Sequence, residues 1–140
     1  MEQFIKEKEL NTHDFRVLIC DDEPRAREAL KTLLSILPIN RTADSKTRVK
    51  VIGEASNGQE AVMKVAECQP DVVLMDARMP VMDGIEATRI IKKKWPRVRV
   101  ILLTMYSDQR VEAMAAGVDD FLLKGCRIED LLKAIQVEPG

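Results

Sequence analysis

The chain has 140 residues, of which 46% are hydrophobic and 32% are charged, and its formal net charge is −1. This length is typical of one compact domain, and this composition excludes disordered, collagen-like and fibrous chains. The small net charge gives no overall attraction to nucleic acid or to an anionic membrane, and no apolar run reaches the roughly 18 residues that a membrane span requires.

The N-terminal leader, residues 1–14, alternates charged and polar side chains. It lacks the apolar block of a secretory signal, so we expect a cytoplasmic protein. The cysteines Cys20, Cys68 and Cys126 are widely spaced and form no C-x-x-C pair, which is typical of reduced thiols. The single histidine, His13, lies in the leader, which excludes most Ser-His and Cys-His catalytic sites and most histidine-containing metal sites.

Beyond the leader, five apolar runs predict strands, and five amphipathic segments predict the helices that follow them. In chain order, these are strand 15–20 with a helix from Pro24 to Leu37, strand 49–53 with a helix around 61–65, strand 72–75 with a helix around 85–92, strand 98–103 with a helix around 111–115 that ends at Gly117, and strand 121–123 with a helix over 128–135. Most strands are continuous Val, Ile and Leu runs, typical of strands covered on both faces. The pattern predicts an α/β fold, a doubly wound parallel sheet built from (βα)5 units.

The predicted domain covers residues 15–137 and is followed by a short tail at 138–140. Within the domain, the connection over 38–48 is polar and longer than the few residues usual between a helix and a strand. We therefore expect a surface insertion there.

Ionisable or hydroxyl side chains follow four of the predicted strands, and these are Asp21, Asp22, Glu23, Asp76, Thr104 and Lys124. In a flavodoxin-like strand order, 2-1-3-4-5, the first and third strands are neighbours, so their carboxylates should converge on the edge where such sheets bind ligands. Like charges held together raise one another's pKa, and Mg²⁺ relieves that repulsion. An ionised aspartate can accept a phosphoryl group without a histidine base, so these residues indicate phosphoryl chemistry.

Four ordered motifs carry a family resemblance, and they are Asp21-Asp22-Glu23, the stretch from Asp76 to Gly84, Leu102-Leu103-Thr104 and Phe121-Leu122-Leu123-Lys124. Together they resemble the receiver domain of two-component response regulators over roughly residues 15 to 136. The resemblance implies a phosphorylation-dependent signalling switch in which Asp76 accepts a phosphoryl group from a sensor histidine kinase.

The resemblance also implies roles for the residues around the acceptor. The ligands of Mg²⁺ would be Asp21, Asp22, Asp76 and the backbone carbonyl of Arg78. The phosphoryl oxygens would be bound by Thr104, Lys124 and the backbone N–H of Ala77. Thr104 would move inward on phosphorylation, and the side chain of Phe121 would turn with it as an aromatic switch.

Two segments, Ile101–Tyr106 and Phe121–Gly125, resemble the NarL/LuxR-type regulators in particular. That resemblance implies transcription regulation through a C-terminal helix-turn-helix DNA-binding domain, for which this chain, ending at Gly140, has no room. It also implies a weak homodimer and control through the surface of the fourth helix, fifth strand and fifth helix. A stand-alone receiver is the alternative.

Three bulky residues predict slow loss of the phosphoryl group. Arg78 lies two positions after Asp76, Tyr106 lies two positions after Thr104, and Met105 is the direct neighbour of Thr104. Their bulk should gate the mouth of the site against water, and none of them offers a carboxylate or amide that would orient water for attack. We therefore expect a comparatively long-lived phosphorylated form.

Other functions fit the sequence less well. An aspartate-nucleophile phosphatase of the haloacid dehalogenase type needs Asp-x-Asp after the first strand and a cap domain, and a flavodoxin-like electron carrier needs a phosphate loop where this chain has acids. Gly53 and Gly58 have the spacing of a phosphate loop, but Gln59-Glu60 replaces the required Lys-Ser/Thr. A pseudo-receiver that acts without phosphorylation also remains. On the receiver interpretation the chain is not an enzyme, apart from its own phosphorylation and dephosphorylation.

One motif departs from the commoner receiver pattern. Many receivers have Lys-Pro where this chain has Lys124-Gly125. Since a cis bond that does not precede proline costs about 2.5–4 kcal/mol, we expect a trans peptide bond here.

Overall fold

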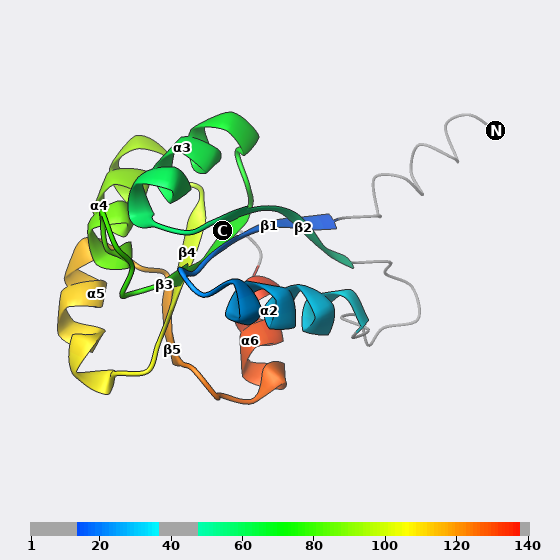
Figure 1. Cartoon of the computed structure of the whole chain (residues 1–140). Coiled ribbons are helices and arrows are strands. Elements are labelled where there is room, and N and C mark those ends of the chain that lie inside the picture. Colours follow the sequence, from blue (N-terminus) through cyan, green and yellow to red (C-terminus); the bar gives the residue numbers. More distant parts are fainter. Residues whose placement is uncertain (1–13, 37–47, 138–140) are drawn as a thin grey trace.

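The computed structural model describes residues 14–36 and 48–137 (Figure 1). His13, the predicted tail at 138–140, and all but one residue each of the predicted leader (1–14) and insertion (38–48) lie outside these residues. The two exceptions correct the predicted boundaries. Asp14 begins the first strand and Arg48 begins the second, because these residues pair with each other at the start of the parallel ladder.

Five strands form one parallel sheet, and they are β1 (Asp14–Cys20), β2 (Arg48–Ala55), β3 (Val72–Asp76), β4 (Arg99–Thr104) and β5 (Asp120–Leu123). Their order is β2-β1-β3-β4-β5, which confirms the predicted flavodoxin-like topology. All five residues of the central strand β3 are buried, whereas only Ala55 is buried in the edge strand β2. The continuous apolar run is therefore clearest where both faces are covered.

The helices connect these strands in the predicted alternation, and they are α2 (Pro24–Ile36), α3 (Gly58–Cys68), α4 (Gly84–Lys94), α5 (Arg110–Ala116) and α6 (Ile128–Ile135). A 3₁₀ turn that the sequence did not predict, η1 (Ser107–Gln109), leads into α5. The predicted strand over 98–103 is shifted by one residue, because Val98 closes a turn on Trp95 and Thr104 pairs with Leu123.

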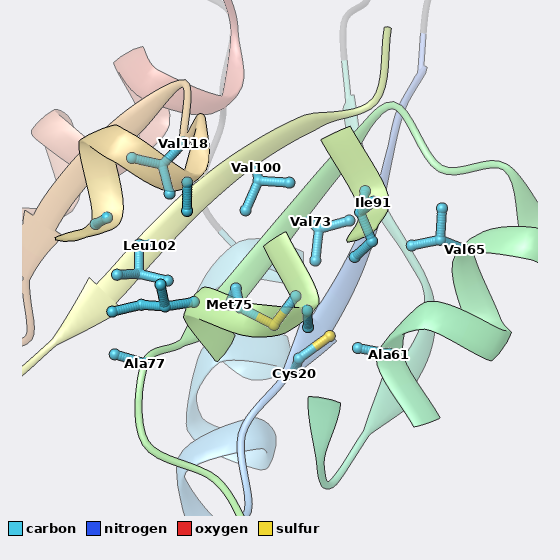
Figure 2. Packing of buried hydrophobic residues seen from close by; sticks show 14 of the residues in the cluster. Cys20, Ala61, Val65, Val73, Met75, Ala77, Ile91, Val100, Leu102 and Val118 are labelled. Carbon is cyan, nitrogen blue, oxygen red and sulfur yellow. The ribbon is translucent and has the colours of Figure 1, made fainter. Parts of the chain in front are cut away.

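The helices cover both faces of the sheet (Figure 1). α2 and α6 pack on one face, where the buried side chains include Ile19, Leu34, Leu74, Leu131 and Ile135. α3, α4 and α5 cover the other face. Figure 2 shows how Ala61, Val65, Ile91 and Val118 pack there against Cys20, Val73, Met75, Val100 and Leu102 of the sheet. Two apolar layers therefore hold the strand ends in a fixed register.

Local signals set the helix ends. The side chains of Asn57 and Asp83 accept hydrogen bonds from the backbone N–H groups of Glu60 and Glu86, both at 2.8 Å, and so begin α3 and α4. Gly117 has φ of 97° and ends α5 in the left-handed conformation, as predicted. These caps supply hydrogen bonds that the exposed helix ends would otherwise lack.

Two further observations concern the described residues as a whole. We find no helix among them whose length and apolar character would let it span a bilayer. Cys20, Cys68 and Cys126 are free thiols, and Cys20 is buried among apolar side chains, where burial raises the pKa of its thiol.

Candidate functional site

The register of the sheet brings the ends of four strands to one edge. Cys20 pairs with Met75, so the residue that follows β1 is level with Asp76 at the end of β3. Thr104 pairs with Leu123, so Lys124 follows directly at the same edge. The carboxyl edge of the sheet therefore holds the side chains that the sequence predicted there.

Three carboxylates converge at this edge. One oxygen from each of Asp21, Asp22 and Asp76 lies within 4.8 Å of the others. Asp21 is 3% exposed and Asp76 is 8% exposed, whereas Asp22 is open to solvent. The Lys124 ammonium donates to Asp21 Oδ2 at 2.9 Å and lies 3.3 Å from Asp76 Oδ2. One positive charge is therefore shared between two buried negative charges, and a third negative charge lies beside them.

Burial and the neighbouring charges shift the pKa values of both Asp76 and Lys124. Burial raises the pKa of Asp76 and the neighbouring Asp21 carboxylate raises it further, while the Lys124 ammonium opposes both; the pKa of Asp76 stands above its ordinary value. Burial alone would lower the pKa of Lys124, but the carboxylates of Asp21 and Asp76 outweigh it and raise that pKa. The lysine is therefore held charged, and the cluster retains a negative excess.

The donor set fits a small hard cation. All three side chains offer carboxylate oxygens, which are the ligands that Mg²⁺ prefers. Two oxygens bound to one Mg²⁺ at about 2.1 Å can lie at most about 4.2 Å apart, so oxygens within 4.8 Å of one another need to move only slightly. Lys124 already bridges two of these carboxylates, which shows that they accept a shared positive charge.

The loop after β1 is fixed by contacts that sequence reasoning missed. The Asp21 backbone N–H donates to the carbonyl of Ala55 at 3.0 Å, and its Oδ1 accepts from the backbone N–H of Glu23 at 2.9 Å. Arg27 donates to the Asp21 carbonyl oxygen at 2.6 Å and to Glu54 at 3.0 Å. From the sequence alone, Arg27 would be taken for a surface residue of an amphipathic helix. Its contacts with Asp21 and Glu54 become visible only when α2 packs on β2.

Close backbone contacts fix the loop after β3. A Cβ at Gly84 would meet the Asp76 carbonyl oxygen, and the Gly84 N–H donates to the Ala77 carbonyl at 2.9 Å. Gly58 donates to the Met82 carbonyl at 2.8 Å, where a Cβ would also clash. In the sequence, Gly84 ends the motif that begins at Asp76, and the motif alone does not reveal its role. Its lack of a side chain lets α4 begin directly against the backbone of Asp76.

One residue of the same loop, Val81, has a strained backbone conformation. Val81 has φ of 71°, and the N–H of Met82 donates across it to the carbonyl of Pro80 at 2.7 Å. This is a γ-turn with a β-branched residue in its centre, an unfavourable conformation for such a side chain. Val81 is also 77% exposed, so little apolar burial offsets the strain.

Thr104 makes its side-chain contacts within its own loop. Its hydroxyl donates to Gln109 Oε1 at 2.5 Å and accepts from the backbone N–H of Tyr106 at 3.2 Å. Phe121, the predicted aromatic switch, is 8% exposed and packs in the core, with the Arg110 guanidinium 5.7 Å from its ring centre. Sequence reasoning gave no role to Gln109, which has no recognisable motif around it.

Two of the three predicted gating residues contact each other. The Arg78 guanidinium lies 3.8 Å from the centre of the Tyr106 ring, which joins the loop after β3 to the loop after β4. Met105 is 67% exposed. The Arg78 backbone N–H points toward Asp76 Oδ1 at a distance of 3.4 Å.

The residue after Lys124 explains the departure from Lys-Pro. Gly125 has φ of 90°, which proline cannot adopt, and the described peptide bonds are all trans. The loop then borders an apolar cleft of about 320 Å³ between α2 and α6, and Asp21 and Asp76 are among the residues that line it.

Known proteins resemble this chain in sequence. A family model described as the response regulator receiver domain matches residues 17–136. The transcriptional regulatory protein LnrK of Bacillus subtilis is 38% identical over 122 residues, which are 86% of this chain and 51% of LnrK. The chain spans about half the length of the curated relatives it matches.

Solved structures give the same result. A two-component response regulator of the LuxR family from Aurantimonas has a TM-score of 0.75 at 31% identity, covering 86% of this chain and 81% of that one. The receiver domain of the NarL regulator from Mycobacterium tuberculosis has a TM-score of 0.75 at 31% identity, covering 88% and 94%. These neighbours confirm the predicted resemblance to NarL/LuxR-type regulators.

Proposed function

Because this chain belongs to the response regulator receiver family, we propose that it is a phosphorylation-dependent signalling switch with Asp76 as the phosphoacceptor. The observation that carries the proposal is the composition of the carboxyl edge. An almost fully buried Asp76 lies beside two further carboxylates and a single ammonium. Such an excess of clustered negative charge destabilises the fold unless a cation offsets it.

In the proposed reaction, an Asp76 carboxylate oxygen attacks the phosphorus of a phosphohistidine on a sensor histidine kinase. The new O–P bond forms as the N–P bond breaks, and the histidine keeps the bonding electron pair and takes a proton. Asp76 needs no base, because at neutral pH its carboxyl is already ionised in the presence of a cation. The acyl phosphate that results is the signalling state.

The chain's own residues position the group. Asp21, Asp22, Asp76 and the backbone carbonyl of Arg78 would hold Mg²⁺, which supplies positive charge to offset that of the carboxylates and phosphoryl oxygens. Lys124, whose ammonium lies 3.3 Å from Asp76 Oδ2, would bind one phosphoryl oxygen. The backbone N–H of Ala77 and the hydroxyl of Thr104 would bind the others. The chain would thereby act as a switch and not as an enzyme, turning over only its own phosphoryl group.

Output would follow from movement of Thr104 and Phe121. These residues border η1, β5 and α5, where Met105, Tyr106, Val111, Met114 and Leu123 are exposed. We propose that the regulated surface lies on α5, β5 and α6. These correspond to the fourth helix, fifth strand and fifth helix of the sequence prediction, because the first predicted helix is labelled α2. By similarity to LuxR-family regulators, a change in this surface would control a weak homodimer and a helix-turn-helix DNA-binding domain elsewhere in the full-length protein.

The test is phosphorylation by a small phosphodonor. The chain is incubated with Mg²⁺ and acetyl phosphate, and its intact mass is measured. We expect one phosphoryl adduct that requires Mg²⁺ and is lost in Asp76→Asn but kept in Asp108→Asn, a matched exposed aspartate in η1. A folded wild-type chain without an adduct would favour the pseudo-receiver alternative.

A further inference from the structure

We propose that Gln109 is a positioning residue that holds the Thr104 hydroxyl away from the phosphoacceptor in the resting state. The inference rests on the proposed function, and it gives a role to Gln109, which lies outside the receiver motifs. It starts from the hydrogen bonds of one buried side chain: Thr104 is 1% exposed, and its hydroxyl donates to Gln109 Oε1 at 2.5 Å.

The hydrogen-bonding capacity of Thr104 makes this contact exclusive. A threonine hydroxyl has one proton to donate. The backbone N–H of Tyr106 already occupies one of its lone pairs at 3.2 Å, so the proton is directed to Gln109. Thr104 cannot donate to a phosphoryl oxygen on Asp76 while this bond is intact. Donation to the phosphoryl group therefore requires the loss of the bond to Gln109.

The position of Gln109 links this bond to the rest of the switch. Gln109 is the last residue of η1, and its own N–H contacts the Tyr106 carbonyl at 3.4 Å. The next residue, Arg110, begins α5 and lies 5.7 Å from the ring centre of Phe121. Release of Gln109 would thus free the turn that connects Thr104 to both α5 and Phe121.

Two substitutions at this position should act in opposite directions. Gln109→Leu removes the acceptor, so switching no longer breaks a hydrogen bond, and binding of beryllofluoride with Mg²⁺ should tighten about fivefold. Gln109→Glu offers a charged and stronger acceptor and should weaken binding about fivefold. Ser107→Ala, on the exposed side of the same turn, is the matched control and should bind as the wild type does.

A double-mutant cycle separates this role from general effects on the turn. In a Thr104→Val background the hydroxyl is absent, so Gln109→Leu and Gln109→Glu should lose the part of their effect that passes through Thr104. Isothermal titration gives the affinities, and thermal unfolding checks that each variant is folded. Unchanged binding in Gln109→Leu, or the same fivefold change in both backgrounds, would overturn the proposal.

Hydrogen exchange without beryllofluoride gives a second and independent result. In Gln109→Leu, the backbone amides of Tyr106 and of η1 should exchange several times faster than in the wild type, and no such difference should appear in the Thr104→Val background. Equal exchange rates would contradict the proposal. If even the wild type failed to bind beryllofluoride, the proposed function would fail, and these exchange rates would still decide whether Gln109 restrains Thr104.

Discussion

The two edges of the sheet handle charge in opposite ways. At the amino edge, all three ammonium protons of Lys92 have acceptors: Asp119 at 2.8 Å, and the carbonyls of Val98 and Pro96 at 2.9 and 3.0 Å. Asp119 in turn accepts from the backbone N–H of Val100 at 2.8 Å. At the carboxyl edge, Lys124 serves two buried carboxylates at once, with a third beside them.

This difference separates stability from function within one sheet. Matched charges at the amino edge act as ties between α4, β4 and β5, and losing one partner leaves the other unsatisfied. Unmatched charges at the carboxyl edge lower the free energy of unfolding of the resting protein, and binding of a positively charged ligand raises it again. Substitutions at the two edges should therefore have effects of opposite sign.

The largest effect should come from the amino edge. Lys92→Met removes one ion pair and two hydrogen bonds, and it leaves Asp119, whose side chain is 29% exposed, with the Val100 N–H as its donor. We expect a loss of about 2–3 kcal/mol in the free energy of unfolding, measured in urea, with no change in Mg²⁺ affinity. Lys93→Met, at the exposed neighbouring position, is the control and should cost under about 0.5 kcal/mol. A change in Mg²⁺ affinity in Lys92→Met would show that the two edges are coupled.

The second effect has the opposite sign. Asp76→Asn should stabilise the metal-free protein at pH 7 by about 1 kcal/mol, because it removes one of three clustered negative charges. Burial raises the pKa of Asp76 in the folded state. The stability that the protonated Asp76 carboxyl contributes is therefore fully present below its pKa in the unfolded chain, and it is lost as the pH rises through its pKa in the folded protein. The advantage of asparagine should therefore vanish near pH 4 and grow toward pH 7.

Thermal unfolding across this pH range measures that difference. Mg²⁺ should stabilise the wild type and so reduce the gap, which links the measurement to metal binding. Asp71→Asn is the control at the amino edge, where the carboxylate accepts from the Arg16 backbone N–H at 2.9 Å. It should destabilise slightly at pH 7. Stabilisation by both asparagines would mean that the two edges do not differ.

Backbone strain provides a third comparison. Val81→Gly relieves a positive φ in the loop beside Asp76 and should stabilise the protein by about 0.5–1 kcal/mol, after allowing for the greater chain entropy of glycine. Val111→Gly is matched in exposure, at 80% against 77%, but lies in the regular helix α5. It should destabilise by about 1 kcal/mol. Chemical denaturation of the two variants checks the signs, and equal signs would remove strain as the cause.

Patterns along the chain predicted the elements and the polar residues at the strand ends, because period and strand ends are local properties. The strand order came from the flavodoxin-like topology adopted for such a chain, and that order in turn predicted the convergence of Asp21, Asp22 and Asp76. The contacts of Arg27 and Gln109 could not be predicted. Each depends on how a helix or turn packs against a distant or irregular segment, and neither residue type is distinctive at its position.

The start of β1 and β2 shows the same limit from another side. Asp14 and Arg48 are polar, which favours assigning Asp14 to the leader and Arg48 to the insertion, yet their mutual pairing extends both strands. The γ-turn at Val81 is a further example. Valine disfavours positive φ, and the hydrogen bonds from Gly58 to Met82 and from Gly84 to Ala77 fix the backbone around it.

The smallest predicted effect concerns the lifetime of the phosphorylated state. We propose that the Arg78 guanidinium and Tyr106 ring, 3.8 Å apart, form a cover that limits the access of water to Asp76. Exposed pairs of this kind contribute about 0.5–1 kcal/mol, so Arg78→Ala and Tyr106→Ala should each speed loss of the phosphoryl group about two- to threefold. Phosphate release from the phosphorylated protein, followed with time, gives these rates.

The double variant shows whether the two side chains act as one unit. If each holds the other in place, removing both should be little worse than removing either, because the cover is already open. Met105→Ala tests the third predicted gating residue, and at 67% exposure it should have a smaller effect than either partner of the pair. Decay that is equal to the wild type, or slower, in both single variants would show that water reaches the phosphoryl group by another path. The expectation of a comparatively long-lived phosphorylated form would then fail as well.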